Sequence, residues 1–206
     1  MNYLINKYII LSTTMLSIAL SIDPPLKLYS ISKQDSSKIL SNEIVVNKIQ
    51  TYENGEHFCV YGIIDEPIDK VFKIISEEEN YPNFMPRFTA VDYHYTDGNY
   101  SYYTFHIGLP LSIKYQYKIK ITEFQSDEFA WIAWELVDWK ENSIADTWGQ
   151  WYFTPVDNNK NFTLIQYQTY IDPGYIPYGM GWIIDLLTRT SLPHIIGNSK
   201  EYIEKK

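Results

Sequence analysis

Residues 111–123 read LSIKYQYKIKITE and show the clearest alternation of apolar and polar side chains in the chain. Side chains of a β-strand point alternately to its two faces, so every second residue of this stretch shares a face. One face is apolar and aromatic, and the other carries Ser, Lys, Gln and Thr, as a solvated face does. The stretch predicts a long strand from Leu111 to Glu123, with a buried face made of Leu111, Ile113, Tyr115, Tyr117, Ile119 and Ile121.

Turn signals on both sides of this strand predict further strands around it. Asn54-Gly55 separates the extended runs 44–53 and 56–64, and Asp97-Gly98-Asn99 separates the runs 89–96 and 100–108. Both are hairpin signals, because the two central residues of a type I′ turn need positive φ. Three strands follow residue 123, and all the connections are short, so we expect an antiparallel meander of strands at 129–136, 147–155 and 162–172.

Helical periodicity appears twice. The segment from Glu66 to Ile75 has Pro in its first turn and apolar residues at i, i+3, i+4 and i+7, which predicts one short amphipathic helix. A second pattern runs from Trp182 to Ile203, and Pro193 inside it predicts a kink or a division. Its apolar face needs an apolar partner, so we expect this long terminal helix to lie against the concave face of the sheet.

The N-terminus is typical of a secretory signal. A short start with one Lys is followed by a mostly apolar run from Tyr8 to Ile22, which contains the small residues Ala19 and Ser21. We therefore predict a signal peptide at 1–21, a linker at 22–43 and one domain at 44–206, in an exported protein. The alternative is an uncleaved segment that anchors the protein to a membrane, although the run is short for a full span.

Composition narrows the class of partner. The chain has 206 residues and a net charge of −8, from 17 Lys and Arg against 25 Asp and Glu, so it lacks the basic surface that nucleic acids select. We expect no nucleic-acid partner. Aromatic residues make up 17% of the chain, and Tyr and Trp suit the wall of a ligand cavity as well as a core.

The order of these elements, and four local stretches, resemble the START-like, or SRPBCC, superfamily. Residues 64–72, with Pro67 before Val71-Phe72, are similar to the family's strand end followed by a Pro-initiated helix. Residues 79–86 read ENYPNFMP and resemble a turn found also in the polyketide cyclase and coenzyme Q-binding subfamilies. Residues 148–155 and 167–174 are similar to the two closing strands of such domains. The resemblance covers roughly residues 44–206.

This resemblance implies an α+β helix-grip fold. A curved antiparallel sheet would wrap around the long C-terminal helix, and short helices would follow the first strand region. It also implies a cavity between sheet and helix, which the aromatic residues predicted to face inward would line. The candidate ligand-binding residues are Tyr103, Phe105, Tyr115, Tyr117, Trp131, Trp151, Tyr167, Ile183 and Leu187.

The sequence offers little evidence of catalysis. The four His residues are scattered, and Cys59 is the single cysteine, so we expect no metal site and no cofactor. Glu135 shares a strand face with Trp131, whereas Ile132 and Trp134 share the other face, and either face fits the interior. With the Trp131 face inside, Glu135 would be a desolvated general acid. Asp146 at a strand end is a second candidate of the same kind.

Three functions remain open on these grounds. We favour non-catalytic binding, with or without transfer, of a lipid or other hydrophobic small molecule by a monomer that contacts a membrane surface transiently. The alternative is an enzyme of the cyclase or dehydrase type that uses a cavity carboxylate or Tyr. A third hypothesis makes the concave surface a groove for a partner protein.

Overall fold

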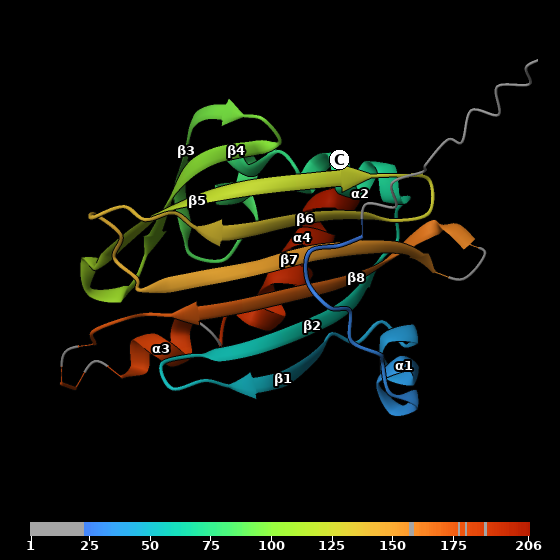
Figure 1. The fold of residues 1–206 in the computed structure, drawn as a ribbon. Coiled ribbons are helices and arrows are strands. Elements are labelled where there is room, and N and C mark those ends of the chain that lie inside the picture. Colours follow the sequence, from blue (N-terminus) through green and yellow to red (C-terminus); the bar gives the residue numbers. More distant parts are fainter. Residues whose placement is uncertain (1–22, 157–158, 177, 180, 188) are drawn as a thin grey trace, which may run out of the picture.

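A computed structural model describes residues 23–156, 159–176, 178–179, 181–187 and 189–206 (Figure 1). The segment assigned above to a signal peptide lies outside these residues, as do Asp157 and Asn158. In the part of the chain that is described, no helix is long and apolar enough to cross a membrane.

One eight-stranded antiparallel sheet forms the centre of the molecule, in the order β1-β2-β8-β7-β6-β5-β4-β3. Its strands are β1 (Val45–Thr51), β2 (Glu56–Ile64), β3 (Phe88–Asp97), β4 (Tyr100–Gly108), β5 (Lys114–Gln125), β6 (Ala130–Leu136), β7 (Asp146–Val156) and β8 (Asn159–Asp172). The helices of the described residues are α1 (Lys33–Leu40), α2 (Ile68–Ile75), α3 (Trp182–Leu187) and α4 (Leu192–Glu204), with 3-10 helices η1 (Glu78–Asn83) and η2 (Pro110–Ser112).

The sheet curves around α4, which lies behind it in Figure 1 together with α2. This arrangement confirms the predicted α+β helix-grip fold. Strands β3 to β8 form the expected meander, but β2 pairs with β8 along its whole length, from Glu56 opposite Ile171 to Ile64 opposite Thr163. The first hairpin is therefore joined to the last strand, and the long connection from β2 to β3 carries α2 and η1 across the concave face.

Both predicted hairpins are present, but their turns are not of type I′. In the first, Tyr52 N–H donates to the Gly55 carbonyl at 2.8 Å and closes a four-residue loop, and neither central residue has positive φ. In the second, Asp97 pairs with Tyr100, and Gly98 is the one loop residue with positive φ, at 59°. A single Gly at the first central position is the pattern of a type II′ turn.

The strand predicted from Leu111 begins three residues later, at Lys114. Pro110 has no N–H to give to a strand ladder, and Leu111 and Ser112 both adopt positive φ, 62° and 61°, in a tight loop. Leu109 N–H donates to the Ile113 carbonyl at 2.8 Å across this loop. As a result Leu111 is 83% exposed instead of buried, whereas the predicted inward face is correct from Tyr115 onward.

The C-terminal pattern divides into two helices, α3 and α4. Pro193 lies in the first turn of α4, where a missing N–H costs no hydrogen bond, so the division falls just before it. Helix α4 buries Leu192, Ile195, Ile196 and Ile203 against the sheet, as the sequence predicts for the terminal helix.

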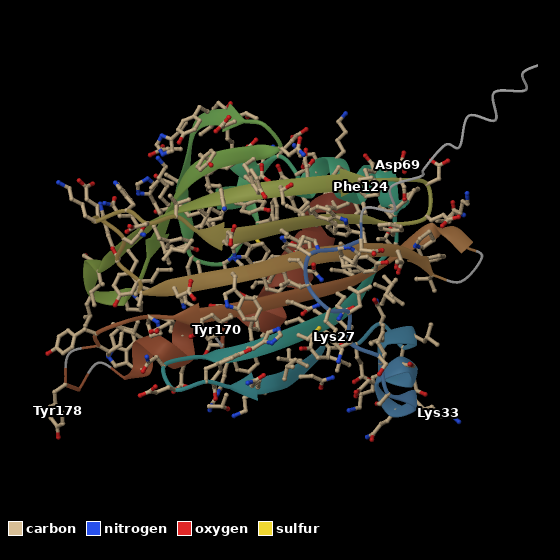
Figure 2. The ribbon with its side chains drawn as sticks, in the orientation of Figure 1. Lys27, Lys33, Asp69, Phe124, Tyr170 and Tyr178 are labelled. Carbon is tan, nitrogen blue, oxygen red and sulfur yellow. The ribbon has the colours of Figure 1, made fainter. Side chains whose placement is uncertain are left out.

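The segment predicted to be a linker is packed. Residues 23–32, here called the N-terminal strap, cross the convex face of the sheet in front of β7 and β8 (Figure 1). Leu26 N–H donates to Gln150 Oε1 at 3.1 Å, and Gln150 Nε2 donates back to the Leu26 carbonyl at 3.2 Å. Gln168 Nε2 donates to the Lys27 carbonyl at 3.0 Å, and Figure 2 places Lys27 over this face. Helix α1 follows the strap and buries Ile39.

Candidate ligand cavity

A cavity of about 90 Å³ lies between the concave face of the sheet and the first turns of α4. Its aromatic wall includes Phe105, Tyr115, Tyr117, Trp134, Trp151 and Tyr167. Ile residues from four strands, from the loop before β7 and from α4 form much of the aliphatic lining. At roughly 10 to 15 Å³ for each enclosed water, this volume suits a slender chain and is well below the size of most drug-sized pockets.

Strand register explains why these side chains converge. Phe105 on β4 is opposite Tyr117 on β5, and Ile121 on β5 is opposite Trp134 on β6. Paired residues share a face, so the alternation that begins in β5 fixes the inward set on both neighbouring strands. Gly149 lets Trp134 lie close over β7, because a Cβ at that position would come within 2.3 Å of the indole ring.

The tyrosine hydroxyls in the cavity wall are neutral donors. Burial raises the pKa of Tyr117 and of Tyr167 well above the ordinary value of a phenol. Burial likewise raises the pKa of Tyr81, which lines the cavity from η1. These groups can donate hydrogen bonds to a ligand carbonyl or hydroxyl, but a phenol with a raised pKa is a poor general base.

One carboxylate, Glu56, lines the cavity at the start of β2. Lys48 Nζ lies 2.9 Å from Glu56 Oε1, and Arg189 Nη2 lies 3.1 Å and 3.2 Å from the two carboxylate oxygens. The hydrogen bond from Lys48, followed by that from Arg189, outweighs the effect of burial and lowers the pKa of Glu56. Glu56 is therefore a paired anion, and its structural role is to connect the segment between α3 and α4 to β2.

Five of the nine predicted ligand-binding residues line the cavity: Phe105, Tyr115, Tyr117, Trp151 and Tyr167. Tyr103 lies on the same face but beside η1, where its hydroxyl is hydrogen-bonded to Glu78. Ile183 packs outside the cavity, in a separate cluster with Ile107 and Leu109. Leu187 belongs to α3, but its side chain lies outside the described residues.

Trp131 faces away from the cavity, which corrects its place among the predicted ligand-binding residues. Ile132 is opposite Trp151 on the concave side, so alternation sends Trp131 to the convex face, where its ring stacks on Phe124 at 6.1 Å. Figure 2 labels Phe124 near the C-terminal end of β5.

The same alternation removes the proposed catalytic acid from the interior. Glu135 lies on the convex face, 2.5 Å from Lys120 Nζ, and its side chain is 58% exposed. Asp146 lies two residues before Trp148 in β7, so both side chains point to the convex face, and Asp146 does not line the cavity. Neither carboxylate is placed to act on a molecule bound there.

Sequence reasoning missed the inward residues of β6 and the contribution of η1. Ile132 and Trp134 line the cavity, but residues 129–136 are apolar on both faces, so alternation alone could not choose between them. Tyr81 and Met85, within the family-like turn at residues 79–86, also line it. In the described part of the chain, no three His, Cys, Asp or Glu residues gather where they could hold a metal ion.

The architecture is similar to that of solved START-type structures. The STAR-related lipid transfer protein of Xanthomonas axonopodis superposes with a TM-score of 0.57 at 14% identity, over 77% of this chain and 98% of that one. Human StAR-related lipid transfer protein 5 gives a TM-score of 0.61 at 8% identity, over 78% of this chain and 86% of its own.

The structure of an enzyme with this architecture superposes on the chain about as well as those of the lipid transfer proteins. The Zhui aromatase/cyclase from a Streptomyces species gives a TM-score of 0.58 at 11% identity, over 73% of this chain and 94% of that one. No family model and no curated protein sequence matches the chain. The structural likenesses establish that the chain has the START-like helix-grip fold, as its sequence motifs predict.

Proposed function

We propose that the protein binds a lipid or another hydrophobic small molecule in the cavity between the sheet and α4, and transfers it without chemical change. The observation that carries this proposal is the lining: it is largely aromatic and aliphatic, and its one carboxylate, Glu56, is already paired. Burying an acyl chain contributes about 0.8 kcal/mol for each CH₂, so a chain of moderate length binds without an ion pair.

Cavity size implies that binding widens the site. A volume of about 90 Å³ does not hold a whole lipid, so α4 and the segment before it must move outward as the ligand enters. Two features allow such a movement: the chain between α3 and α4 is short, and the Gly174 to Gly181 passage contains two glycines with positive φ.

Transfer requires contact with a membrane, and the end of the molecule formed by η2 and the passage before α3 carries exposed apolar side chains that favour such contact. The loop at η2 and the passage before α3 meet in one apolar cluster, which contains Ile113 and Ile176. From these loops Leu111, Tyr175 and Tyr178 project with exposed fractions of 83%, 88% and 106%, and Figure 2 shows Tyr178 at the extreme end. Aromatic and aliphatic tips of this kind partition into the interface of a bilayer.

A cavity-filling variant tests the proposed binding function. Ile119 is fully buried and lines the cavity, so Ile119→Trp should fill it and abolish uptake of dodecanol from solution. Ile39→Trp is the matched control, because Ile39 is equally buried but lies under α1, outside the cavity. Uptake is measured by native mass spectrometry on protein whose fold is verified by circular dichroism. Unchanged uptake by folded Ile119→Trp would contradict the proposal.

Export completes the proposal and has its own test. We infer that the protein is secreted or periplasmic, with residues 1–21 removed, and that it acts as a monomer. Intact-mass measurement of the protein from its native envelope or medium gives the first residue of the mature chain. A mass that includes residues 1–21 would favour the anchored alternative.

A cyclase or dehydrase is the second candidate function, favoured by the similar aromatase/cyclase fold and by neutral tyrosines in the cavity wall. Such an enzyme would rely on Tyr117 or Tyr167 as a hydrogen-bond donor. Tyr167→Phe would then abolish turnover of a bound substrate, whereas a carrier would retain its ligand with about the same affinity.

A further inference from the structure

The apolar cavity lies next to a polar groove, and the two share part of their lining. Pro86, Arg87, Phe88 and Ser191 line both of them, so a passage from cavity to groove would lie between the loop before β3 and the start of α4. The groove has a volume of about 370 Å³, and its other lining residues are Thr89, Gly108, Thr190, His194 and Asn198. A molecule that spans the passage would meet apolar side chains on one side and mostly polar groups on the other.

Arg87 is the cation where the cavity and the groove meet, and its side chain is exposed. The chain contains two arginines, Arg87 and Arg189. Arg189 makes two hydrogen bonds to Glu56, whereas Arg87 forms no side-chain hydrogen bond or ion pair with any residue that the structure describes. No carboxylate lines the groove, although the protein as a whole carries a net charge of −8. An acidic protein thus presents an uncompensated guanidinium at the opening of an apolar cavity.

The backbone holds Arg87 at this place at a cost. Its φ is 72°, in the left-handed region that non-glycine residues rarely adopt, where the Cβ approaches the following carbonyl oxygen. The Arg87 carbonyl accepts a hydrogen bond from Gly108 N–H at 2.9 Å, which ties the loop to the end of β4. The next residue, Phe88, packs its ring 5.0 Å from Phe105 and 5.5 Å from Tyr81, both in the cavity wall. Packing on the C-terminal side therefore fixes a strained residue at the opening.

We propose that Arg87 and the polar groove bind the anionic head of a single-chain amphiphile whose tail occupies the apolar cavity. A guanidinium pairs with a carboxylate or a phosphate monoester through charge-assisted hydrogen bonds. The Thr190 hydroxyl, the His194 imidazole and the Asn198 amide of the groove can donate further hydrogen bonds to the head, whereas the hydroxyls of Thr89 and Ser191 already donate to backbone carbonyls. The slender cavity suits one acyl chain. This inference rests on the proposed binding function, and it adds the chemical class of the ligand.

The test compares two probes that differ in the head alone, dodecanoate and dodecanol, by isothermal titration calorimetry at neutral pH. Wild-type protein should bind dodecanoate roughly three- to tenfold more tightly than dodecanol, as expected for a charged hydrogen bond at a partly exposed site. Arg87→Gln should bind the two probes about equally. Lys73→Gln is the matched control: it removes one charge from an exposed position on α2 and should keep the preference.

The outcomes separate this inference from the proposed function. Equal affinity of wild-type protein for both probes would overturn the head-group site and leave hydrophobic binding in place, as would an unchanged preference in Arg87→Gln. If wild-type protein binds neither probe, the proposed function and the inference both fail. Loss of the preference in Arg87→Gln, with retention in Lys73→Gln, supports the site.

Two further probes distinguish the sources of the anion. Dodecyl phosphate that binds more tightly than dodecanoate would identify a phosphate monoester head, and the reverse order would identify a carboxylate. Inorganic phosphate should displace dodecanoate poorly, because it lacks the tail. Displacement as effective as that by dodecyl phosphate would overturn the amphiphile and leave a simple anion site.

Discussion

Glu78 is a carboxylic acid buried among apolar residues, with 3% of its surface exposed. Burial, with a smaller contribution from the nearby Glu123, raises its pKa from the ordinary value of 4.5 to about 8, and a hydrogen bond from Tyr103 offsets part of this rise. The folded protein therefore keeps the proton up to about pH 8, whereas the unfolded chain releases it near pH 4.5. Since the folded state binds the extra proton, the contribution of Glu78 to stability is greatest below pH 4.5 and falls as pH rises toward 8.

Glu78→Gln should remove this dependence. The wild-type free energy of unfolding is expected to fall by about 1.4 kcal/mol per pH unit within this window, from this group alone. The variant should show a flatter profile and higher stability at pH 8, as measured by urea denaturation across the window. Glu79→Gln, on the exposed neighbour, is the control and should keep the wild-type slope. Parallel profiles for Glu78→Gln and wild-type protein would show that Glu78 ionises normally in the folded state.

At the same scale, the sequence predicts the direction of a side chain well where a strand has one apolar face and poorly where it has two. Tyr115 and Tyr117 alternate with Lys and Gln, so their inward direction follows from the sequence. Trp131 and Trp134 both belong to an apolar run: Trp134 faces the cavity, and Trp131 is buried on the convex face, where its ring stacks on Phe124. Nothing in the sequence marks Arg87 as a candidate site residue, because the sequence does not show which carboxylates the fold brings near its side chain.

Among the elements, the connection between α3 and α4 is held closed over the cavity by one ion-pair cluster. Arg189 bonds both oxygens of Glu56 on β2 and also lies 3.8 Å from Asp185 on α3. Arg189→Gln should release this connection and speed both uptake and release of dodecanol, which has no charge that salt could screen, by roughly two- to fivefold, as measured by stopped flow. The effect is small because solvent screens an exposed ion pair.

Salt and a second ion pair provide the controls for this latch. High ionic strength should raise the wild-type rates toward those of Arg189→Gln and leave the variant unchanged, because salt screens exposed charges. Lys205→Gln breaks the exposed pair of Lys205 and Glu201 at the far end of α4 and should leave the rates as they are. Rates that are equal in wild-type protein and Arg189→Gln would assign the barrier to packing of α4 itself.

Element boundaries show where sequence patterns stop being sufficient. The helix after Pro67 and the division at Pro193 follow from local chemistry, and both are correct. Helix α1 was missed, although Ser32 and Asp35 form a capping pair in which Ser32 Oγ accepts from Asp35 N–H at 3.0 Å. Its weak apolar periodicity hid it, since its one buried residue is Ile39. Strand β5 was extended too far because Leu111 fits the alternation although Pro110 precedes it.

For the whole molecule, the largest feature beyond sequence reasoning is that the sheet is covered on both faces. On the concave face, the terminal helix covers the sheet as its apolar pattern predicts. On the convex face, Gln150 and Gln168 are only 0% and 1% exposed. Buried amides need hydrogen-bonding partners, and the strap backbone supplies them through Leu26 and Lys27. Polar residues that look solvated in the sequence are therefore part of the interior.

Removal of the strap and α1 should destabilise the domain, which would not happen if residues 22–43 were only a linker. A chain that starts at Ile44 leaves Gln150 and Gln168 without these partners and uncovers the cluster of Val45, Cys59 and Tyr61 under Ile39. Relative to a chain that starts at Asp23, we expect a loss of about 3 to 6 kcal/mol in urea denaturation, from the apolar burial and hydrogen bonds together.

Two comparisons separate this effect from damage to the cavity. Ile39→Ala in the longer chain should account for about 2 to 4 kcal/mol of the loss, because it removes the helix anchor and keeps the strap. Below the denaturation range, both chains should bind dodecanol with the same affinity, since the strap lies on the face opposite the cavity. Equal stability of the two chains would return residues 22–43 to the role of a linker. A chain that folds but no longer binds dodecanol would instead show that the convex cover sets the curvature of the sheet and thereby the width of the cavity.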